Sequence, residues 1–265
     1  MSYIGTMSTD NNTKINQLIN AHPPEAVLLV GWLAGHGYSP DLQKRYRKSG
    51  WFDSVGSGAM IRAGRKASYE GAIYALQKQA GGTVHPAGRT ALALQGKAHY
   101  LELATKRVTL FGGAKERLPK WFQEYDWGVE VDYHPTSFLP PDAGLVEFNA
   151  GAFSINISSP VRALMECLYL APEKQDLVEC TELMDGLNNL RPQTVQALLE
   201  QCASVKVKRL FLYLAEKSGH EWAKHLDLKK VDLGKGKRAL VKGGAYVAKH
   251  QITVPKELEK NEPEV

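Results

Sequence analysis

The sequence predicts an α+β fold, a mixed α/β architecture that begins with a winged helix-turn-helix. Residues 25–62 carry, in order, the signals of a helix, a tight turn, a basic helix and a glycine-tipped hairpin. From there to residue 256, short β-type runs interchange with segments of helical periodicity. We therefore expect a winged helix domain over residues 13–67 and a mixed α/β domain over residues 68–256.

The helix-turn-helix is predicted from its apolar and glycine pattern. Ala26–Ala34 is an apolar run long enough for a buried helix, and Gly35 and Gly37 permit the positive φ of a tight turn. Ser39 then occupies an N-cap position, and Pro40 at the first helical position has no N–H to lose. A second, basic helix is expected to start there and to end near the next glycine.

The predicted wing follows this helix directly. Trp51–Val55 and Ala59–Arg62 can pair as a hairpin around a Gly-Ser-Gly tip. Upstream, Thr13–Ala21 has apolar residues at helical spacing and supplies a first helix. This order is typical of DNA-binding winged helix domains.

The charge of this region favours a DNA-binding role. Between Asp41 and Lys66 there are seven basic and two acidic residues. Lys and Arg neutralise phosphates, and Arg and Gln also read base edges in the major groove. The alternative is a solvated charged helix followed by an ordinary hairpin, but the ordered turn, cap, helix and wing favour DNA. The expected DNA-binding residues are Ser39, Gln43, Lys44, Arg45, Tyr46, Arg47, Lys48, Ser57 and Arg62.

The remaining chain reads as an α/β module followed by a helical section. About five strands are expected in the module, and the helical section closes with short strands. The predicted helices are 69–79, 90–94, 118–125, 160–169, 176–187, 192–202, 205–218 and a short one around Trp222. The predicted strands are 83–85, 98–103, 108–111, 129–133, 145–148, 153–157, 239–241 and 251–254. Residues 1–12 and the polar tail from Pro255 onward are expected to lack regular structure.

Composition excludes several classes of protein. With 43% hydrophobic and 23% charged residues the chain is ordinary for a globular protein, and it has no apolar run of membrane-spanning length. The polar N-terminus does not resemble a signal peptide. Cys167, Cys180 and Cys202 lie in apolar helical context without metal-ligand spacing. We expect reduced core cysteines, a cytoplasmic location, and neither a membrane, a metal nor a cofactor.

A second basic stretch covers residues 204–251, with twelve basic and four acidic residues. It could compete for an RNA or nucleotide, or add DNA-backbone contacts. The alternative is a solvated face whose lysine stems cover apolar neighbours. Its candidate residues are Lys206, Lys208, Arg209, Lys235, Lys237 and Arg238.

Three further motifs have competing interpretations. His85 and Arg89 could hold a phosphate at a helix start, but satisfaction of buried backbone is favoured. Gly234–Lys237 lacks the spacing of a phosphate-binding P-loop and is better explained as a basic turn. The carboxylates Glu130, Asp132 and Glu147 fall on neighbouring predicted strands, as in a metal nuclease. The lysine that such a site needs is replaced by Asn149, so no catalytic residues are expected.

Longer motifs resemble a known family. The segments GWLAGHGYSPDLQKRYRKSGWFDSVGSGAMIRAG, SYEGAIYALQ and TVHPAGRTALALQGKAHYL, with residues 187–255, are similar to the AbiEi antitoxins of bacterial type IV toxin–antitoxin (abortive infection) systems. The resemblance covers about residues 12–256. It implies a winged helix-turn-helix followed by an antitoxin domain, repression of the protein's own operon through inverted repeats in double-stranded DNA, and a partner resembling the AbiEii nucleotidyltransferase-like toxin, without a stable complex.

Two other functions remain open at the level of sequence. One is a nuclease or nucleotide-processing enzyme with a DNA-targeting head, which would show metal-dependent turnover. The other is a transcription regulator of a different operon, which would have no effect on any toxin. The sequence favours the antitoxin over both.

Overall fold

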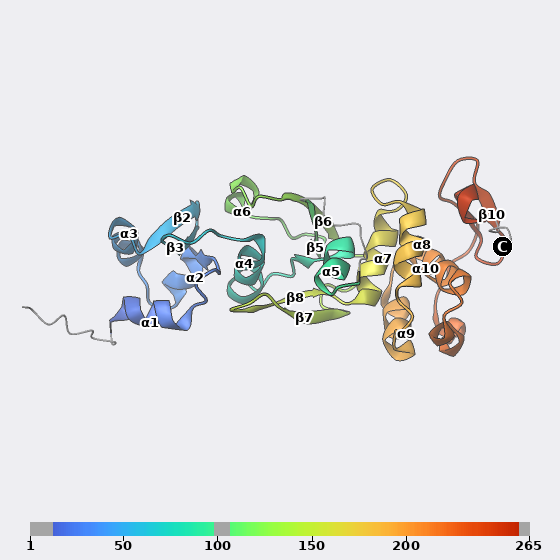
Figure 1. Ribbon diagram of the computed structural model, residues 1–265, viewed down its shortest axis with the longest axis horizontal. Coiled ribbons are helices and arrows are strands. Elements are labelled where there is room, and N and C mark those ends of the chain that lie inside the picture. Colours follow the sequence, from blue (N-terminus) through green and yellow to red (C-terminus); the bar gives the residue numbers. More distant parts are fainter. Residues whose placement is uncertain (1–12, 98–106, 260–265) are drawn as a thin grey trace, which may run out of the picture. The chain divides into compact units, whose positions relative to one another are not determined.

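The computed structural model describes residues 13–97 and 107–259, which divide into two compact units (Figure 1). Helices and short strands in small sheets both occur, and a run of strands is followed by a run of helices, as expected for an α+β protein. Within the described residues, the first unit comprises 13–82, 118–127 and 149–155, and the second comprises 83–97, 107–117, 128–148 and 156–259. Residues 1–12, which are expected to lack regular structure, and the predicted strand 98–103 lie outside the described residues.

The first unit begins with a winged helix-turn-helix. Three helices and three strands follow one another, and the antiparallel sheet has the order β1-β3-β2. The elements are α1 (Lys14–Ala21), β1 (Leu28–Leu29), α2 (Val30–Gly35), α3 (Pro40–Lys48), β2 (Phe52–Gly56) and β3 (Ala59–Arg62). Five buried apolar side chains form a common core, one from each of α1, β1, α2, β2 and β3: Leu18, Leu28, Leu33, Phe52 and Met60.

The apolar run Ala26–Ala34 was expected to be a single helix, and that prediction is wrong at its first half. Its start is extended, and β1 pairs with β3 before α2 begins at Val30. The cause is a set of partners from distant parts of the chain. Leu29 donates its backbone N–H to the Gln79 side chain at 2.8 Å, and Val30 donates to the Gly58 carbonyl at 2.9 Å.

Helix α4 (Tyr69–Tyr74) packs in the same unit as the winged helix. It continues as a wider π-helical turn, Ala75–Gln79, within the predicted helix 69–79. The Gln79 amide also donates to the Val27 carbonyl at 2.8 Å. The compact unit therefore extends beyond residue 67, and independent folding of residues 13–67 stays a prediction.

Helix α6 (Lys120–Glu124) also belongs to the first unit. Its Trp121 and Phe122 side chains are buried beside Trp127. Gly56 at the end of β2 has φ +138°, and a Cβ there would lie 2.9 Å from Trp121 Cβ. Only glycine satisfies both this φ and this close approach.

The predicted strands of the middle part of the chain lie in two separate small sheets. In the first sheet β4 pairs antiparallel with β5, and β5 pairs parallel with β6. The strands of this sheet are β4 (His85–Pro86), β5 (Arg107–Gly113) and β6 (Glu130–Thr136). A two-stranded sheet is formed by β7 (Leu145–Asn149) and β8 (Ser154–Ser158).

Helices form most of the core of the second unit. Ser159 and Ser204 cap α7 and α10 by accepting backbone N–H groups, as side chains at N-caps commonly do. Eight of the eleven residues of α7 are buried, which makes α7 the central element of this core. The helices are α5 (Gly88–Leu94), α7 (Pro160–Leu170), α8 (Leu177–Asp185), α9 (Pro192–Gln201) and α10 (Val205–Lys217).

After α10 the chain forms short elements. The helix expected around Trp222 is a 3-10 turn, Glu221–His225, followed by 3-10 turns at Leu228–Lys230 and Lys256–Leu258. A final sheet has the order β10-β11-β9 and includes a strand that the sequence pattern did not predict, β10. Its strands are β9 (Arg238–Ala239), β10 (Ala245–Val247) and β11 (Ile252–Val254). Within the described residues, no helix has the length and apolarity needed to span a membrane.

Candidate nucleic-acid interface

Helix α3 holds the position of the recognition helix in the helix-turn-helix. Ser39 caps it by accepting the Leu42 N–H at 3.3 Å, and Pro40 occupies the first helical position. Gly37 adopts φ +83° in the turn that separates α2 from α3. The sequence therefore places the start of α3 correctly, and Ser39 acts in the cap.

Gln43 was expected to read DNA, and the structure corrects this prediction. Its side chain is only 1% exposed, and the amide donates to the carbonyls of Val30 at 3.1 Å and Tyr38 at 2.7 Å. Gln43 thereby joins α3 to the start of α2 and to the turn between them. A side chain whose amide hydrogens are used in this way cannot also read a base edge.

Two more of the predicted DNA contacts are used within the fold. Tyr46 is half-buried, with its ring 6.3 Å from the ring of Phe52, and it packs against the core of the winged helix. Arg62 is half-buried and donates to the carbonyl of His22 at 2.8 Å, at the end of α1. These side chains hold α3 and β3 in place, so they are no longer first choices for DNA contact.

Four cations of α3 remain exposed: Lys44, Arg45, Arg47 and Lys48. Helical geometry places Lys44 and Lys48 one turn apart, on the side opposite to the inner side that carries Gln43 and Tyr46. Arg45 and Arg47 flank this side. The exposed Ser57 lies at the tip of the wing between two glycines of positive φ. Cations on the outer side of a capped helix are an arrangement suited to phosphates and base edges.

The second basic stretch is divided between core and surface. Lys206 donates to the carbonyls of Tyr169 and Ala171, each at 2.7 Å, and burial lowers the pKa of its ammonium group. Lys208 and Arg209 are each only 3% exposed. The prediction that these three form part of a basic surface is corrected, because Lys208 and Arg209 are buried and the ammonium group of Lys206 is bonded to backbone carbonyls.

Arg209 is the most extensively bonded of these cations. Its guanidinium donates to four backbone carbonyls that all lie in the segment after α10: Leu233, Gly234, Gly236 and Gln251. Lys235, Lys237 and Arg238 are exposed as expected. The exposed basic surface is therefore carried by the loop and strand that Arg209 holds, and we call Lys235, Lys237, Arg238 and Lys242 the C-terminal basic surface.

The phosphate site considered at His85 and Arg89 is occupied by a protein carboxylate. The buried Glu166 accepts the Gly88 N–H at the start of α5 at 3.0 Å and contacts His85 Nε2 at 3.2 Å. Arg162 Nε donates to the same carboxylate at 2.8 Å. Arg89 pairs instead with Glu179 at 3.0 Å. The favoured interpretation, in which the two side chains satisfy buried backbone, holds for His85, whose Nδ1 contacts the Thr83 carbonyl at 2.6 Å, but not for Arg89.

The three carboxylates of the nuclease alternative do not converge. Glu130 pairs with Arg107 at 2.8 Å, and Asp132 pairs with His134 at 2.9 Å. Glu147 lies on β7, in a different sheet from the strand that carries the other two. In the part of the chain that the structure describes, no group of His, Cys, Asp or Glu is arranged to hold a metal ion.

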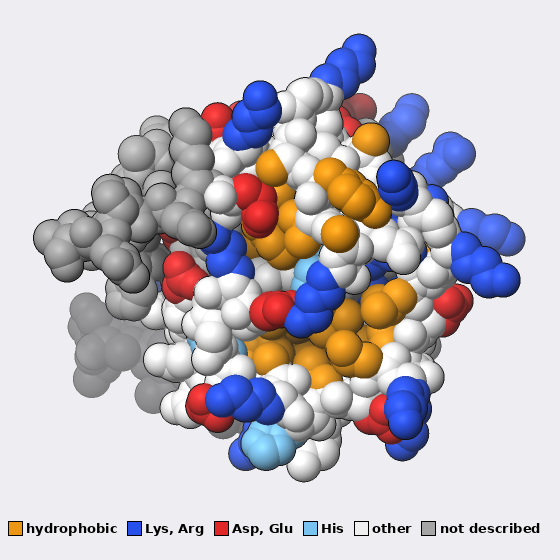
Figure 2. Space-filling model, turned by 90° about the vertical axis from the view of Figure 1, so that its right-hand side faces the viewer, with side chains coloured by type: hydrophobic (Ala, Val, Ile, Leu, Met, Phe, Trp, Pro, Cys, Tyr) orange, Lys and Arg blue, Asp and Glu red, His pale blue; other side chains and the backbone are white. Residues whose placement is uncertain are grey.

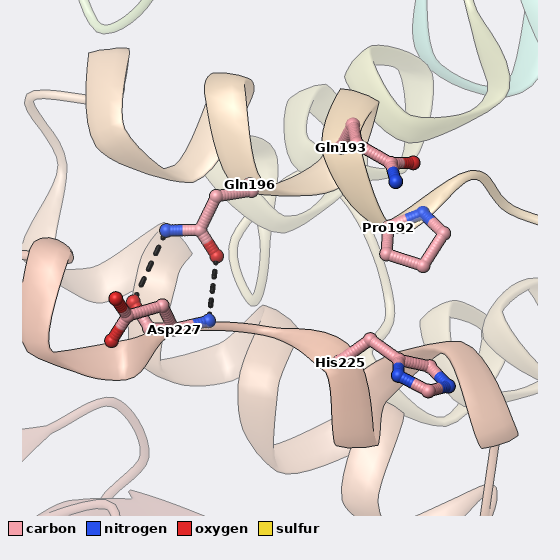
Figure 3. Close-up of a pocket in the computed structure, with 5 residues that line it drawn as sticks. All are labelled: Pro192, Gln193, Gln196, His225 and Asp227. Atoms are coloured by element: carbon pink, nitrogen blue, oxygen red, sulfur yellow. Dashed lines mark hydrogen bonds between the residues drawn. The ribbon is translucent and has the colours of Figure 1, made fainter.

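An open hollow of about 410 Å³ lies between α9 and the 3-10 turns (Figure 3). Side chains in its wall hold these two parts of the fold together. The Gln196 side chain accepts the Asp227 N–H at 2.9 Å and donates to the Asp227 carbonyl at 3.1 Å. This double hydrogen bond fastens the turn to α9. Pro192, Gln193 and His225 complete the wall.

Comparison with protein families decides the assignment. Residues 105–255 match the model described as "Transcriptional regulator, AbiEi antitoxin, Type IV TA system". Residues 11–103 match the model of the AbiEi antitoxin N-terminal domain, also described as a transcriptional regulator. The chain belongs to the AbiEi antitoxin family. The expected resemblance is thereby confirmed, and the family is one of transcriptional-regulator antitoxins of type IV toxin–antitoxin systems.

Solved structures support the fold of this AbiEi protein. The RV2827C protein from Mycobacterium tuberculosis aligns with a TM-score of 0.59 over 90% of this chain and 88% of that chain, at 17% identity. A search of curated proteins found no match. At this identity the structural likeness establishes the α+β fold alone.

Proposed function

We propose that this AbiEi protein binds double-stranded operator DNA through α3 and the wing, and represses its own operon. The observation that supports this most directly is the arrangement of α3. Its inner side is fixed by Gln43 and Tyr46, while Lys44, Arg45 and their neighbours are exposed on the outside. A rigid helix with an outward cationic side suits a major groove.

The test is a salt-titrated binding assay with inverted repeats from the protein's own promoter. Arg45→Ala and Arg47→Ala should weaken binding, whereas Lys78→Ala, an exposed cation on another element, should not. Loss of a phosphate contact lowers the salt slope by about one, and loss of a base contact relaxes specificity at one position by about 1–3 kcal/mol. Wild-type affinity in both arginine variants would exclude α3 as the recognition helix.

We further propose that the protein neutralises a nucleotidyltransferase-like toxin in the cytoplasm without forming a stable complex with it. Family membership supports this, and the C-terminal basic surface supplies exposed groups for it. Co-expression should rescue cells from the partner toxin, and purification of either tagged protein should leave the other behind. A regulator of an unrelated operon would give no rescue.

The proposed function involves no catalysis by this protein. Glu130 and Asp132 are engaged in separate ion pairs, and Glu147 lies in another sheet. Purified protein with Mg²⁺ or Mn²⁺ should leave DNA, RNA and nucleotides intact. Cleavage that disappears in Glu130→Gln or Glu147→Gln would instead identify a nuclease.

A further inference from the structure

The small sheet β10-β11-β9 has one buried and one open face. Ile252 and Val254 of the central strand are fully buried and define the inner face. The loop that leads into the sheet is held by the buried Arg209, which donates to the carbonyls of Gly236 at 2.6 Å and Gln251 at 3.2 Å. The open face is therefore presented on a well-anchored support.

An exposed tyrosine stands on the open face. Tyr246 pairs with Thr253, and Thr253 pairs with Ala239, so side-chain alternation places all three opposite to Ile252. Tyr246 is 44% exposed, and its partners across the sheet are small. The flat aromatic ring is therefore accessible, because no large side chain stands next to it on this face of the sheet.

Positive charge surrounds this ring. Lys237 Nζ lies 4.8 Å from the centroid of Tyr246. Residues 233–250 contain five Lys or Arg and no Asp or Glu. Figure 2 faces the end of the second unit that carries β10 and shows Lys and Arg side chains projecting around its margin. An exposed ring among cations on a sheet is the combination by which many proteins hold unpaired bases and their phosphates.

We propose that the open face of β9, β10 and β11 binds single-stranded nucleic acid. A base stacks on the Tyr246 ring, and Lys237 moves from that ring to a phosphate, with Lys235 and Lys242 along the backbone. A duplex is disfavoured because its bases are already stacked and offer no free face to the ring. This binding activity is independent of the operator binding assigned to α3.

The experiment measures the fluorescence anisotropy of labelled 12-mers of uridine RNA, thymidine DNA and a mixed DNA duplex with the full-length protein. Tyr246→Ala should weaken binding of the single strands about five- to 150-fold, the range expected from loss of one stacking contact. Tyr246→Phe keeps the ring and should stay within about twofold of the wild type. Leu228→Ala removes another side chain of similar exposure, 47%, and serves as the matched control.

The salt dependence of the affinity distinguishes the contribution of charge from that of stacking. Lys237→Ala should lower the slope of log affinity against log salt by about 0.7, whereas Tyr246→Ala should leave that slope unchanged. Neither change should affect operator binding, which Arg45→Ala and Arg47→Ala test independently. Preference between the uridine and thymidine strands identifies RNA or DNA as the ligand.

Two results would overturn the inference. One is unchanged single-strand affinity in a folded Tyr246→Ala protein. The other is binding of polyglutamate or duplex that competes with the single strands and is insensitive to Tyr246, which would indicate an acidic protein or duplex as the ligand. If thermal melting shows that Tyr246→Ala is unfolded, the folded variant Lys237→Glu is used in its place. An affinity of Lys237→Glu for single strands equal to that of the wild type would likewise contradict the inference.

Discussion

Glu166 is the residue on which the buried polar groups of the second unit converge. Its carboxylate receives hydrogen bonds from Ser158 at 2.7 Å and Gly88 at 3.0 Å, besides its contacts with Arg162 and His85. Burial alone would raise the pKa of Glu166, but hydrogen bonds and electrostatic interactions with His85 and Arg162 outweigh it and hold that pKa below its usual value. The ionised carboxylate is thus part of the folded structure.

Glu166→Gln should lower the free energy of unfolding at neutral pH by about 3 kcal/mol, because Arg162 is left buried without its counter-charge. Urea unfolding measures this change. Glu130→Gln, which breaks the exposed pair with Arg107, should cost less than about 1 kcal/mol. Equal effects of the two changes would show that the buried cluster contributes no more than a surface pair.

The Glu166 contribution also has a defined pH window. Since the pKa is lowered in the folded state, this stability is fully present above the usual pKa of 4.5 and is lost as pH falls through the lower pKa of the folded state. The difference in unfolding free energy between wild type and Glu166→Gln should therefore shrink as the pH falls below 4.5. A difference that is constant down to pH 3 would contradict the proposed ionisation.

His22 gives the first unit a different pH dependence. Burial lowers the pKa of His22 from 6.5 to about 4, so the unfolded chain binds a proton that the folded chain excludes. Stability should fall as pH drops from 6.5 to about 4 and change no further from this group below that. Measured by thermal unfolding across this range, His22→Gln should flatten the curve, and an unchanged curve would assign the dependence to other groups.

At the scale of elements, the contact between α2 and α3 determines how the recognition helix is presented. The two helices are short, with six and nine residues, and would not be stable alone. Gln43 ties their junction through the Val30 and Tyr38 carbonyls. The orientation of the exposed cations therefore depends on a residue that does not itself face outward.

Gln43→Ala should weaken operator binding without changing sequence preference. It leaves two carbonyls short of a partner, which costs about 1–3 kcal/mol and loosens α3. Affinities for the operator and for its single-base-pair variants should all fall by the same factor, measured by anisotropy. A selective loss at one base pair would mean that Gln43 reads DNA after all.

At the scale of the whole molecule, the two basic regions predict separable activities. Arg45→Ala with Arg47→Ala should lose operator binding and still rescue cells from the toxin. Alanine at Lys235, Lys237 and Arg238 should do the reverse. The substitutions are made at exposed residues of the full-length protein. Charge reversal at Lys208 and Arg209 is avoided, because these residues are buried and the change would disrupt the fold. Loss of both activities in either folded variant would argue against this division.

Truncation is predicted to be a poor substitute for such variants. A chain that starts near Ser68 removes β1 and β2, which in the intact first unit contact Gln79 and lie against α6. We expect it to bind an apolar dye and to elute as aggregates in size-exclusion chromatography. A monomeric, cooperatively unfolding product would instead support a domain boundary after residue 67.

The sequence by itself determined the local elements of this protein. Caps, prolines and glycines act within a few residues, so the start of α3, the wing and the long helix α10 were predicted close to where they lie. The four exposed cations of α3 also followed from residue type and position. The motifs of the AbiEi family, being long and ordered, were equally visible without a structure.

Only the tertiary structure decided which polar side chains face inward. Gln43, Lys206 and Arg209 have the residue types of a surface, yet each is held by backbone carbonyls from other parts of the chain. Gln43 shares a helical face with Tyr46, a weak signal of this burial. The carbonyls themselves are supplied by segments as far as 42 residues away, and such partners leave no periodic signal in the sequence. Burial of a polar group depends on those distant acceptors, because without them its desolvation would be too costly.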